Sequence, residues 1–156
     1  MKGLQLDNGT IKIFNSVPKS FGNIIGGFNT LNDTELEAYG FYNIVKPTIT
    51  ESQELGAIEW DSSNSVFTYP VNDKTFAQSL AEMKVQKIAN LKHSYGSELA
   101  KTDWIIIRDQ ELGNTTDSDI LSSRATLRSD CATHESSING KTTKAQVVDY
   151  SLPNLM

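Results

Sequence analysis

The change in hydrophobic period near Asp73 limits the fold of this chain more than any other feature of its sequence. Before Asp73, apolar and polar residues alternate in short runs, which is typical of β-strands, whereas after it apolar residues recur every three or four positions, as on one face of an α-helix. A chain of 156 residues in which strands come first and helices follow is expected to have an α+β fold.

Residues 1–72 are predicted to form a small, mostly antiparallel β module. The segment from Leu4 to Phe14 is expected to be a β-hairpin, because Asn8 and Gly9 supply the positive φ angles that a tight turn requires. The further elements expected are a capped helix between Asn32 and Gly40, a strand from Phe41 to Ile49, and a second hairpin made of Gly56–Trp60 and Val66–Val71.

Residues 73–140 are predicted to form two helices packed as an antiparallel hairpin. The first is expected to end near Leu99, and residues 103–113 are expected to be a connector with a buried middle. The second is expected to begin at a capping box on Thr116 and to end before Gly140. The stripe of the first helix consists of Phe76, Leu80, Met83, Lys87, Leu91 and Tyr95.

Residues 141–156 are predicted to be a strand, over 141–150, followed by an extended tail. Three residues of the tail are apolar, and its proline restricts the backbone before docking, so little entropy is lost on binding. We therefore expect the tail to contact a neighbouring chain, although packing on the chain's own β module is an alternative. The candidate interface residues are Leu152, Pro153, Leu155 and Met156.

The charge and the composition exclude several classes of protein. Fourteen Lys and Arg residues against 19 Asp and Glu residues give a net charge of −5, and no basic block stands out. Direct binding to nucleic acid is therefore not expected. No signal peptide and no apolar run long enough to span a membrane is recognisable, so no membrane contact is expected. The single Cys131 excludes an internal disulfide and a multi-cysteine metal site.

No residue pattern predicts catalysis, a cofactor or a metal. The glycine-rich segment 22–27 lacks the Lys-Ser/Thr of a phosphate-binding loop, and we expect a flexible loop there. Cys131 and His134 lie one helical turn apart, but packing explains them better than a nucleophile with its base. Asp117 and Asp119 are expected to cap a helix rather than to bind Ca²⁺. An enzyme such as a small hydrolase would need a convergent polar site that the sequence does not display.

Two stretches resemble a widespread group of small bacteriophage tail proteins, and together they span about residues 17–135. The first comprises Val17-Pro-Lys-Ser-Phe21, Phe28-Asn-Thr-Leu31, Asp33 to Leu36, Tyr39 to Tyr42, and Phe67-Thr-Tyr-Pro-Val71. The second comprises Thr102-Asp-Trp104 through Arg108, Glu111-Leu-Gly113, Asp119-Ile120, and Arg124 to Arg128. One departure is that Thr115-Thr116 stands where these proteins usually have a proline before the second helix.

The resemblance implies a structural or assembly role without catalysis. The protein is expected to be made in the host bacterial cytoplasm and to become a virion component at the tail tip, the baseplate or the fibre attachment. Its partners would be other phage tail proteins, and several copies would form a symmetric assembly. A tail-fibre assembly chaperone that is absent from the mature virion is the alternative. Within the helices, Arg108, Arg124 and Arg128 are expected to pair with Asp103, Asp109 or Glu111, mostly as surface salt bridges.

Overall fold

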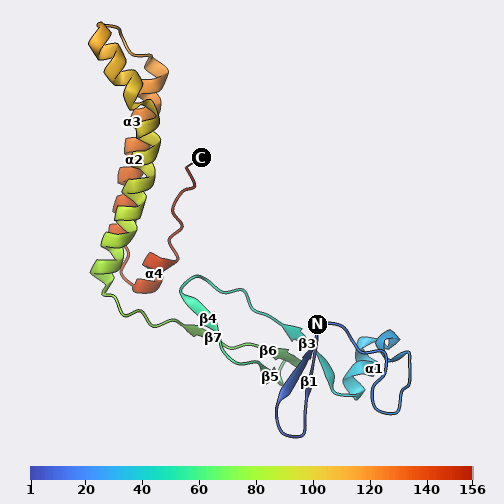
Figure 1. Cartoon of the computed structure of the whole chain (residues 1–156). Helices are drawn as coiled ribbons and strands as arrows, with labels where there is room; N and C mark the ends of the chain where they lie inside the picture. The colour runs from blue at the N-terminus through green and yellow to red at the C-terminus, as the bar shows by residue number, and fades with distance from the viewer. Residues whose placement is uncertain (156) are drawn as a thin grey trace. The chain divides into compact units, whose positions relative to one another are not determined.

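The computed structural model describes residues 1–155 and divides into two compact units, Met1–Lys74 and Thr75–Met156 (Figure 1). The first unit is built mainly from strands and the second from helices. Each unit has a hydrophobic cluster of its own. The predicted α+β class, with strands before helices, is confirmed.

A five-stranded sheet forms the first unit, in the order β2-β1-β3-β6-β5. Gly9, with a φ of 82°, turns the chain between β1 and β2, so the first predicted hairpin is confirmed. The second hairpin joins β5 and β6, while β3 and β6 pair in parallel as the exception in an otherwise antiparallel sheet. The strands are β1 (Lys2–Gln5), β2 (Ile11–Phe14), β3 (Phe41–Val45), β5 (Glu59–Asp61) and β6 (Val66–Thr68).

Two further strands make a separate two-stranded antiparallel sheet that the sequence did not predict. β4 (Gln53–Leu55) pairs with β7 (Val71–Asp73). Gly56 follows β4 and lies so close to Pro70 that an added Cβ would come within 2.7 Å of the proline ring. Any larger residue would therefore force the two segments apart.

The core of the first unit lies on one face of the large sheet. Phe28, in a 3-10 turn (η1, Phe28–Thr30), packs with Phe41 of β3 and with Leu36 of helix α1 (Asp33–Ala38). α1 begins at Asn32, whose side chain forms a capping box with Glu35, as expected for this short helix. A helix of six residues is marginal alone, so its contact with the sheet stabilises it.

The opposite face of the same sheet carries an aromatic cluster. Phe67 is buried against Tyr42 and Trp60, and its ring lies directly over Gly3 of β1. A Cβ on Gly3 would come within 2.5 Å of the Phe67 ring. Strand β1 therefore needs glycine here so that the ring can approach the backbone.

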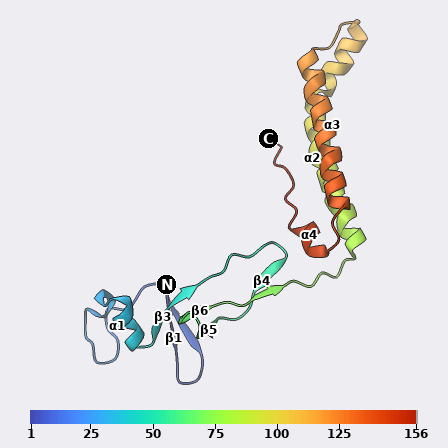
Figure 2. The ribbon, with the colours of Figure 1, turned by 180° about the vertical axis from the view of Figure 1, so that it is seen from behind.

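Two long helices form the predicted antiparallel hairpin of the second unit (Figure 2). α2 (Leu80–Leu112) has 33 residues and α3 (Ser118–Asn139) has 22. The expected connector over residues 103–113 is wrong, because α2 continues through it to Gly113. No proline or glycine interrupts residues 97–112, and Gly113 ends the helix with a left-handed φ of 68°.

The other helix boundaries of this unit differ in smaller ways. Asp117, rather than Thr116, caps α3 through its side chain. Gly140 follows α3 as expected, although its backbone is right-handed, with a φ of −71°. The strand predicted over 141–150 is wrong, because α4 (Lys144–Val148) lies there, capped by Thr143 and anchored by the buried Val147.

Candidate protein-interaction surface

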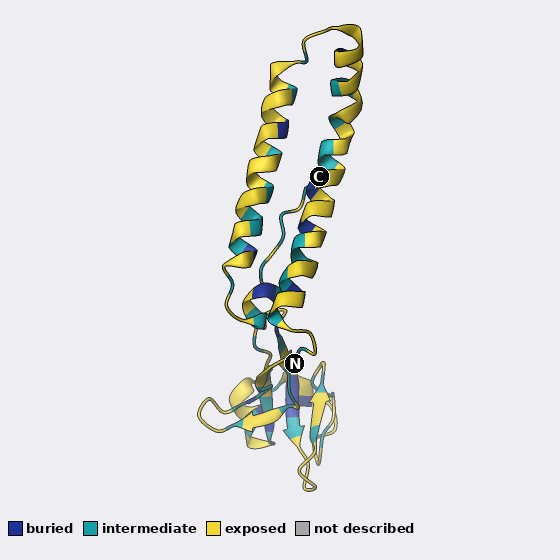
Figure 3. Ribbon diagram, turned by 90° about the vertical axis from the view of Figure 1, so that its left-hand side faces the viewer, coloured by how far each residue is buried: buried dark blue, intermediate teal, exposed yellow. Residues whose placement is uncertain are grey.

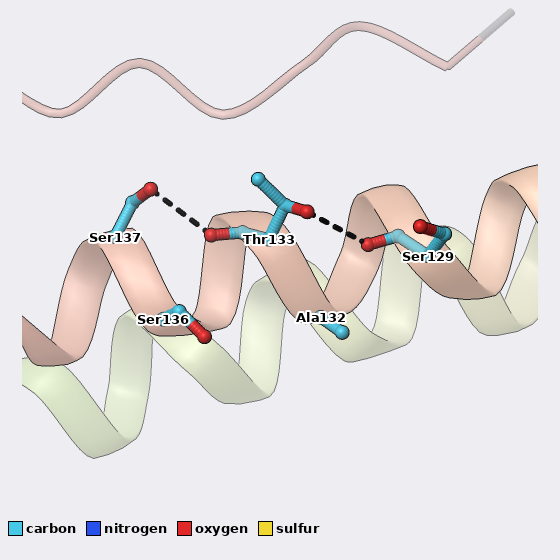
Figure 4. Close-up of a pocket in the computed structure, with 5 residues that line it drawn as sticks. All are labelled: Ser129, Ala132, Thr133, Ser136 and Ser137. Carbon is cyan, nitrogen blue, oxygen red and sulfur yellow. Dashed lines mark hydrogen bonds between the residues drawn. The ribbon is translucent and has the colours of Figure 1, made fainter.

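The C-terminal tail lies along the chain's own helical hairpin. Leu152 and Leu155 are half-buried against the cluster of Leu91, Tyr95 and Ile138, contributed by α2 and α3. The tail therefore packs on the hairpin of its own unit, and Figure 4 shows it running beside α3. The predicted contact of Leu152, Pro153 and Leu155 with a neighbouring chain stays a prediction. Met156 lies outside the described residues.

Polar contacts fix the start of the tail. The Tyr150 hydroxyl and His134 Nδ1 are 2.6 Å apart and form a hydrogen bond. Lys87 Nζ donates to the Val148 carbonyl at 3.1 Å, which ties the end of α4 to α2. Lys141 Nζ lies 4.9 Å from the centre of the Tyr150 ring. These contacts and the two leucines place the tail as a third layer over the hairpin.

Arg124 joins the two helices through a buried polar network. Only 8 % of Arg124 is exposed, and its Nη2 donates to Asp103 at 2.6 Å. Its Nη1 donates to the Leu99 carbonyl at 2.7 Å and to the Thr102 hydroxyl. The expected Arg124–Asp103 pair is thus present. Because the arginine side chain is buried and only Asp103 is half-exposed, Arg124 acts as an internal cross-link rather than as a surface charge.

A second arginine organises the outer face of α2. Arg108 Nε and Nη2 both donate to Asp109 Oδ1, at 3.1 and 2.8 Å. The same guanidinium lies 5.0 Å from the centre of the Trp104 ring. Arg108 is therefore held in place on one side by a buried carboxylate and on the other by an aromatic face.

Large apolar side chains lie on this outer face instead of in a buried connector. Trp104 is 59 % exposed and Ile107 is 55 % exposed. Thr102, Ile106 and Asp109, from the same stretch of α2, are buried or half-buried. Figure 3 shows this division along the hairpin, with burial concentrated on the inward faces. We define Trp104, Ile107 and Arg108 as the outer α2 patch.

The outer surface of α3 has a different character. It is lined by Ser129, Ala132, Thr133, Ser136 and Ser137, which form a shallow hollow (Figure 4). The Thr133 hydroxyl donates to the Ser129 carbonyl and the Ser137 hydroxyl to the Thr133 carbonyl, both at 3.0 Å. These two hydroxyls are thus engaged with the preceding turn of their own helix.

The residues considered for chemistry do not converge on a reactive centre. Burial raises the pKa of the Cys131 thiol, which disfavours the thiolate. His134 uses Nδ1 for Tyr150, and Asp117 uses its carboxylate to cap α3. Within residues 1–155, no group of three or more His, Cys, Asp or Glu side chains could hold a metal ion. No helix among these residues is long and apolar enough to cross a membrane.

Comparison of the chain with models of known protein families, with curated proteins and with solved structures finds no match. The candidate surface therefore depends on geometry. The outer α2 patch was missed in the sequence because residues 103–113 were interpreted as a connector. Continuing the helical period would have placed Trp104 and Ile107 on the face opposite Thr102 and Ile106.

Proposed function

We propose that this protein is a structural component of a bacteriophage tail, at the tail tip, the baseplate or the fibre attachment, and that it acts through protein–protein contacts. The resemblance of two stretches to phage tail proteins gives the biological setting. The outer α2 patch is the observation that best supports the mode of action, because it exposes Trp104 and Ile107 on a long helix that other contacts hold in place.

The composition of the patch suits a protein partner. Tryptophan and arginine are enriched among the residues that dominate binding energy at interfaces. Trp104 and Arg108 are already stacked, and Asp109 orients the guanidinium, so little side-chain freedom is lost when a partner covers them. A patch on one helix face can be presented repeatedly in a symmetric assembly, so several copies could bind equivalent sites on other tail proteins.

Quantitative mass spectrometry of purified phage particles tests this proposal. A virion component is expected in several copies per particle. If the chain is absent from particles but co-purifies from infected cells with an unassembled fibre protein, it is the assembly chaperone instead. If it is found in neither fraction, the proposed setting in the phage tail is wrong.

A further inference from the structure

A pocket of about 470 Å³ lies in the first unit. It forms beside the end of β3, where β4 and the segment joining β6 to β7 also approach. Its volume falls within the range of pockets that hold small ligands, which leaves room for a short peptide segment rather than for one side chain alone. The lining residues are Met1, Ile44, Lys46, Leu55, Gly56 and Tyr69.

Backbone contacts define the walls of this pocket. The Ile44 amide donates to the Met1 carbonyl at 3.2 Å, and the Gly56 amide donates to the Pro70 carbonyl at 2.8 Å. The close approach of Gly56 to Pro70 keeps β4 near the segment that carries Tyr69. Main-chain pairing therefore positions the segments that carry the lining residues.

The lining combines an apolar surface with two polar side chains that can donate. Met1, Ile44 and Leu55 contribute aliphatic or thioether groups. Lys46 Nζ and the Tyr69 hydroxyl have no hydrogen bond or ion pair with any residue in the described part of the chain. An ammonium group and a hydroxyl among the residues that line a largely apolar pocket complement a carboxylate attached to an apolar group.

We infer that this pocket binds a segment of a partner protein that carries a large aliphatic side chain next to an aspartate or glutamate. The aliphatic side chain enters the space between Ile44, Leu55 and Tyr69, and the carboxylate accepts from Lys46 and Tyr69. This inference rests on the proposed function in one respect, namely that the partner is a protein. It adds a second contact surface, on the other unit, and specifies the chemistry that this surface recognises.

Peptide titration of the full-length ¹⁵N-labelled protein tests the inference. The probe is acetyl-Gly-Asp-Leu-Gly-amide, and the matched peptides replace either Asp with Asn or Leu with Ser. We expect the Asp-Leu peptide to shift the amide signals of Lys46, Leu55, Gly56 and Tyr69. Loss of the carboxylate should weaken binding by about two- to fivefold, the range for an exposed ion pair, and loss of the leucine should abolish it.

Protein variants separate the charge effect from a structural one. Lys46→Gln should remove the preference for Asp over Asn while leaving the affinity for the Asn peptide unchanged. Lys46→Arg should retain the preference, and Lys19→Gln, which removes an exposed lysine of the same unit, should have no effect. Equal affinity of the native protein for the Asp and Asn peptides, shifts centred elsewhere, or no binding at millimolar peptide would overturn the inference. None of these results depends on whether the chain is present in phage particles, so the inference can fail without the proposed function failing.

Discussion

The two units differ in the side chains that they bury and in how they present the exposed ones. The β unit has a core of Phe28, Leu36 and Phe41, brought together from a turn, a helix and a strand. The helical unit has a core of Leu91, Tyr95 and Ile138, shared by α2 and α3, and adds the buried Arg124 and its own tail. Both units leave large apolar side chains exposed, from Ile25 in the β unit to Trp104 in the hairpin. The hairpin presents Trp104 on a long helix beside an arginine that is held in place, and this arrangement suits a protein partner.

The largest expected effect is the loss of an aromatic side chain from the β unit. Phe41 is fully buried, and its ring lies 4.7–5.2 Å from those of Phe14, Phe21 and Phe28. Phe41→Ala should lower the free energy of unfolding of this unit by about 3–5 kcal/mol. With Trp104 replaced by Phe, Trp60 is the sole tryptophan, and its fluorescence reports the transition. The control is Ile25→Ala, at a side chain that is 95 % exposed, which should change the free energy of unfolding by less than about 0.5 kcal/mol.

The buried arginine should matter next most, and only in the helical unit. Arg124→Ala removes hydrogen bonds from a charged donor and leaves the Thr102 hydroxyl without this partner. We expect the free energy of unfolding of the helical unit to fall by about 2–3 kcal/mol, measured by urea unfolding followed by circular dichroism at 222 nm. Arg128→Ala is the matched control, because Arg128 is exposed on the same helix. Equal effects of the two substitutions would contradict the cross-linking role of Arg124.

Removing the tail should have a smaller effect on the same transition. Deletion of residues 152–156 uncovers Leu91 and Ile138 but loses only two half-buried leucines from the described part of the tail. Because the tail no longer has to be ordered on folding, part of this loss is offset, and we expect the free energy of unfolding of the helical unit to fall by about 1–2 kcal/mol. The Trp60 transition of the β unit should stay unchanged. If the deletion leaves the stability of the helical unit unchanged, the tail does not dock as described.

The smallest effect concerns acid stability of the β unit. Lys2, whose Nζ lies 3.0 Å from Asp33, and the Asn43 amide lower the pKa of the Asp33 carboxyl. Because the folded pKa lies below the unfolded one, the stabilisation is present above about pH 4 and is lost as the pH falls through the folded pKa. Asp33→Asn should therefore flatten the pH dependence of unfolding below pH 4. Asp7→Asn, at an exposed turn position, serves as the comparison.

Local signals in the sequence predicted the parts of the fold that local chemistry controls. Asn8-Gly9 predicted the first hairpin, and Asn32 with Glu35 predicted the start of α1. The pairing of β4 with β7 was not predictable in this way, because it joins residues about 20 positions apart through three-residue strands. The continuation of α2 was not predicted because the β-branched run Ile105–Ile107 favours a strand by propensity, whereas the structure places this run within α2.

The candidate surface was predictable only in part, for a related reason. Arg124 completes the helical spacing of α3, so its inward position follows from the sequence, but its partners on α2 depend on the register of the hairpin. The apolar residues of the tail were predicted to contact a neighbouring chain, and the structure places Leu152 and Leu155 on the chain's own hairpin. Their site could not be predicted, because it consists of side chains from two helices that meet only in the folded unit.

The most direct test of the central claim compares two exposed residues on α2 for their effect on assembly. Trp104→Ala should leave the unfolding transition within about 0.5 kcal/mol of the native protein, since the side chain is mostly exposed. Quantitative mass spectrometry of purified particles should nevertheless show at least about a tenfold loss of the variant, which corresponds to about 1.4 kcal/mol at a binding hot spot. Val85→Ala, at a residue 69 % exposed on the same helix, should be incorporated normally. Normal incorporation of Trp104→Ala would contradict the claim that the outer α2 patch is the contact surface.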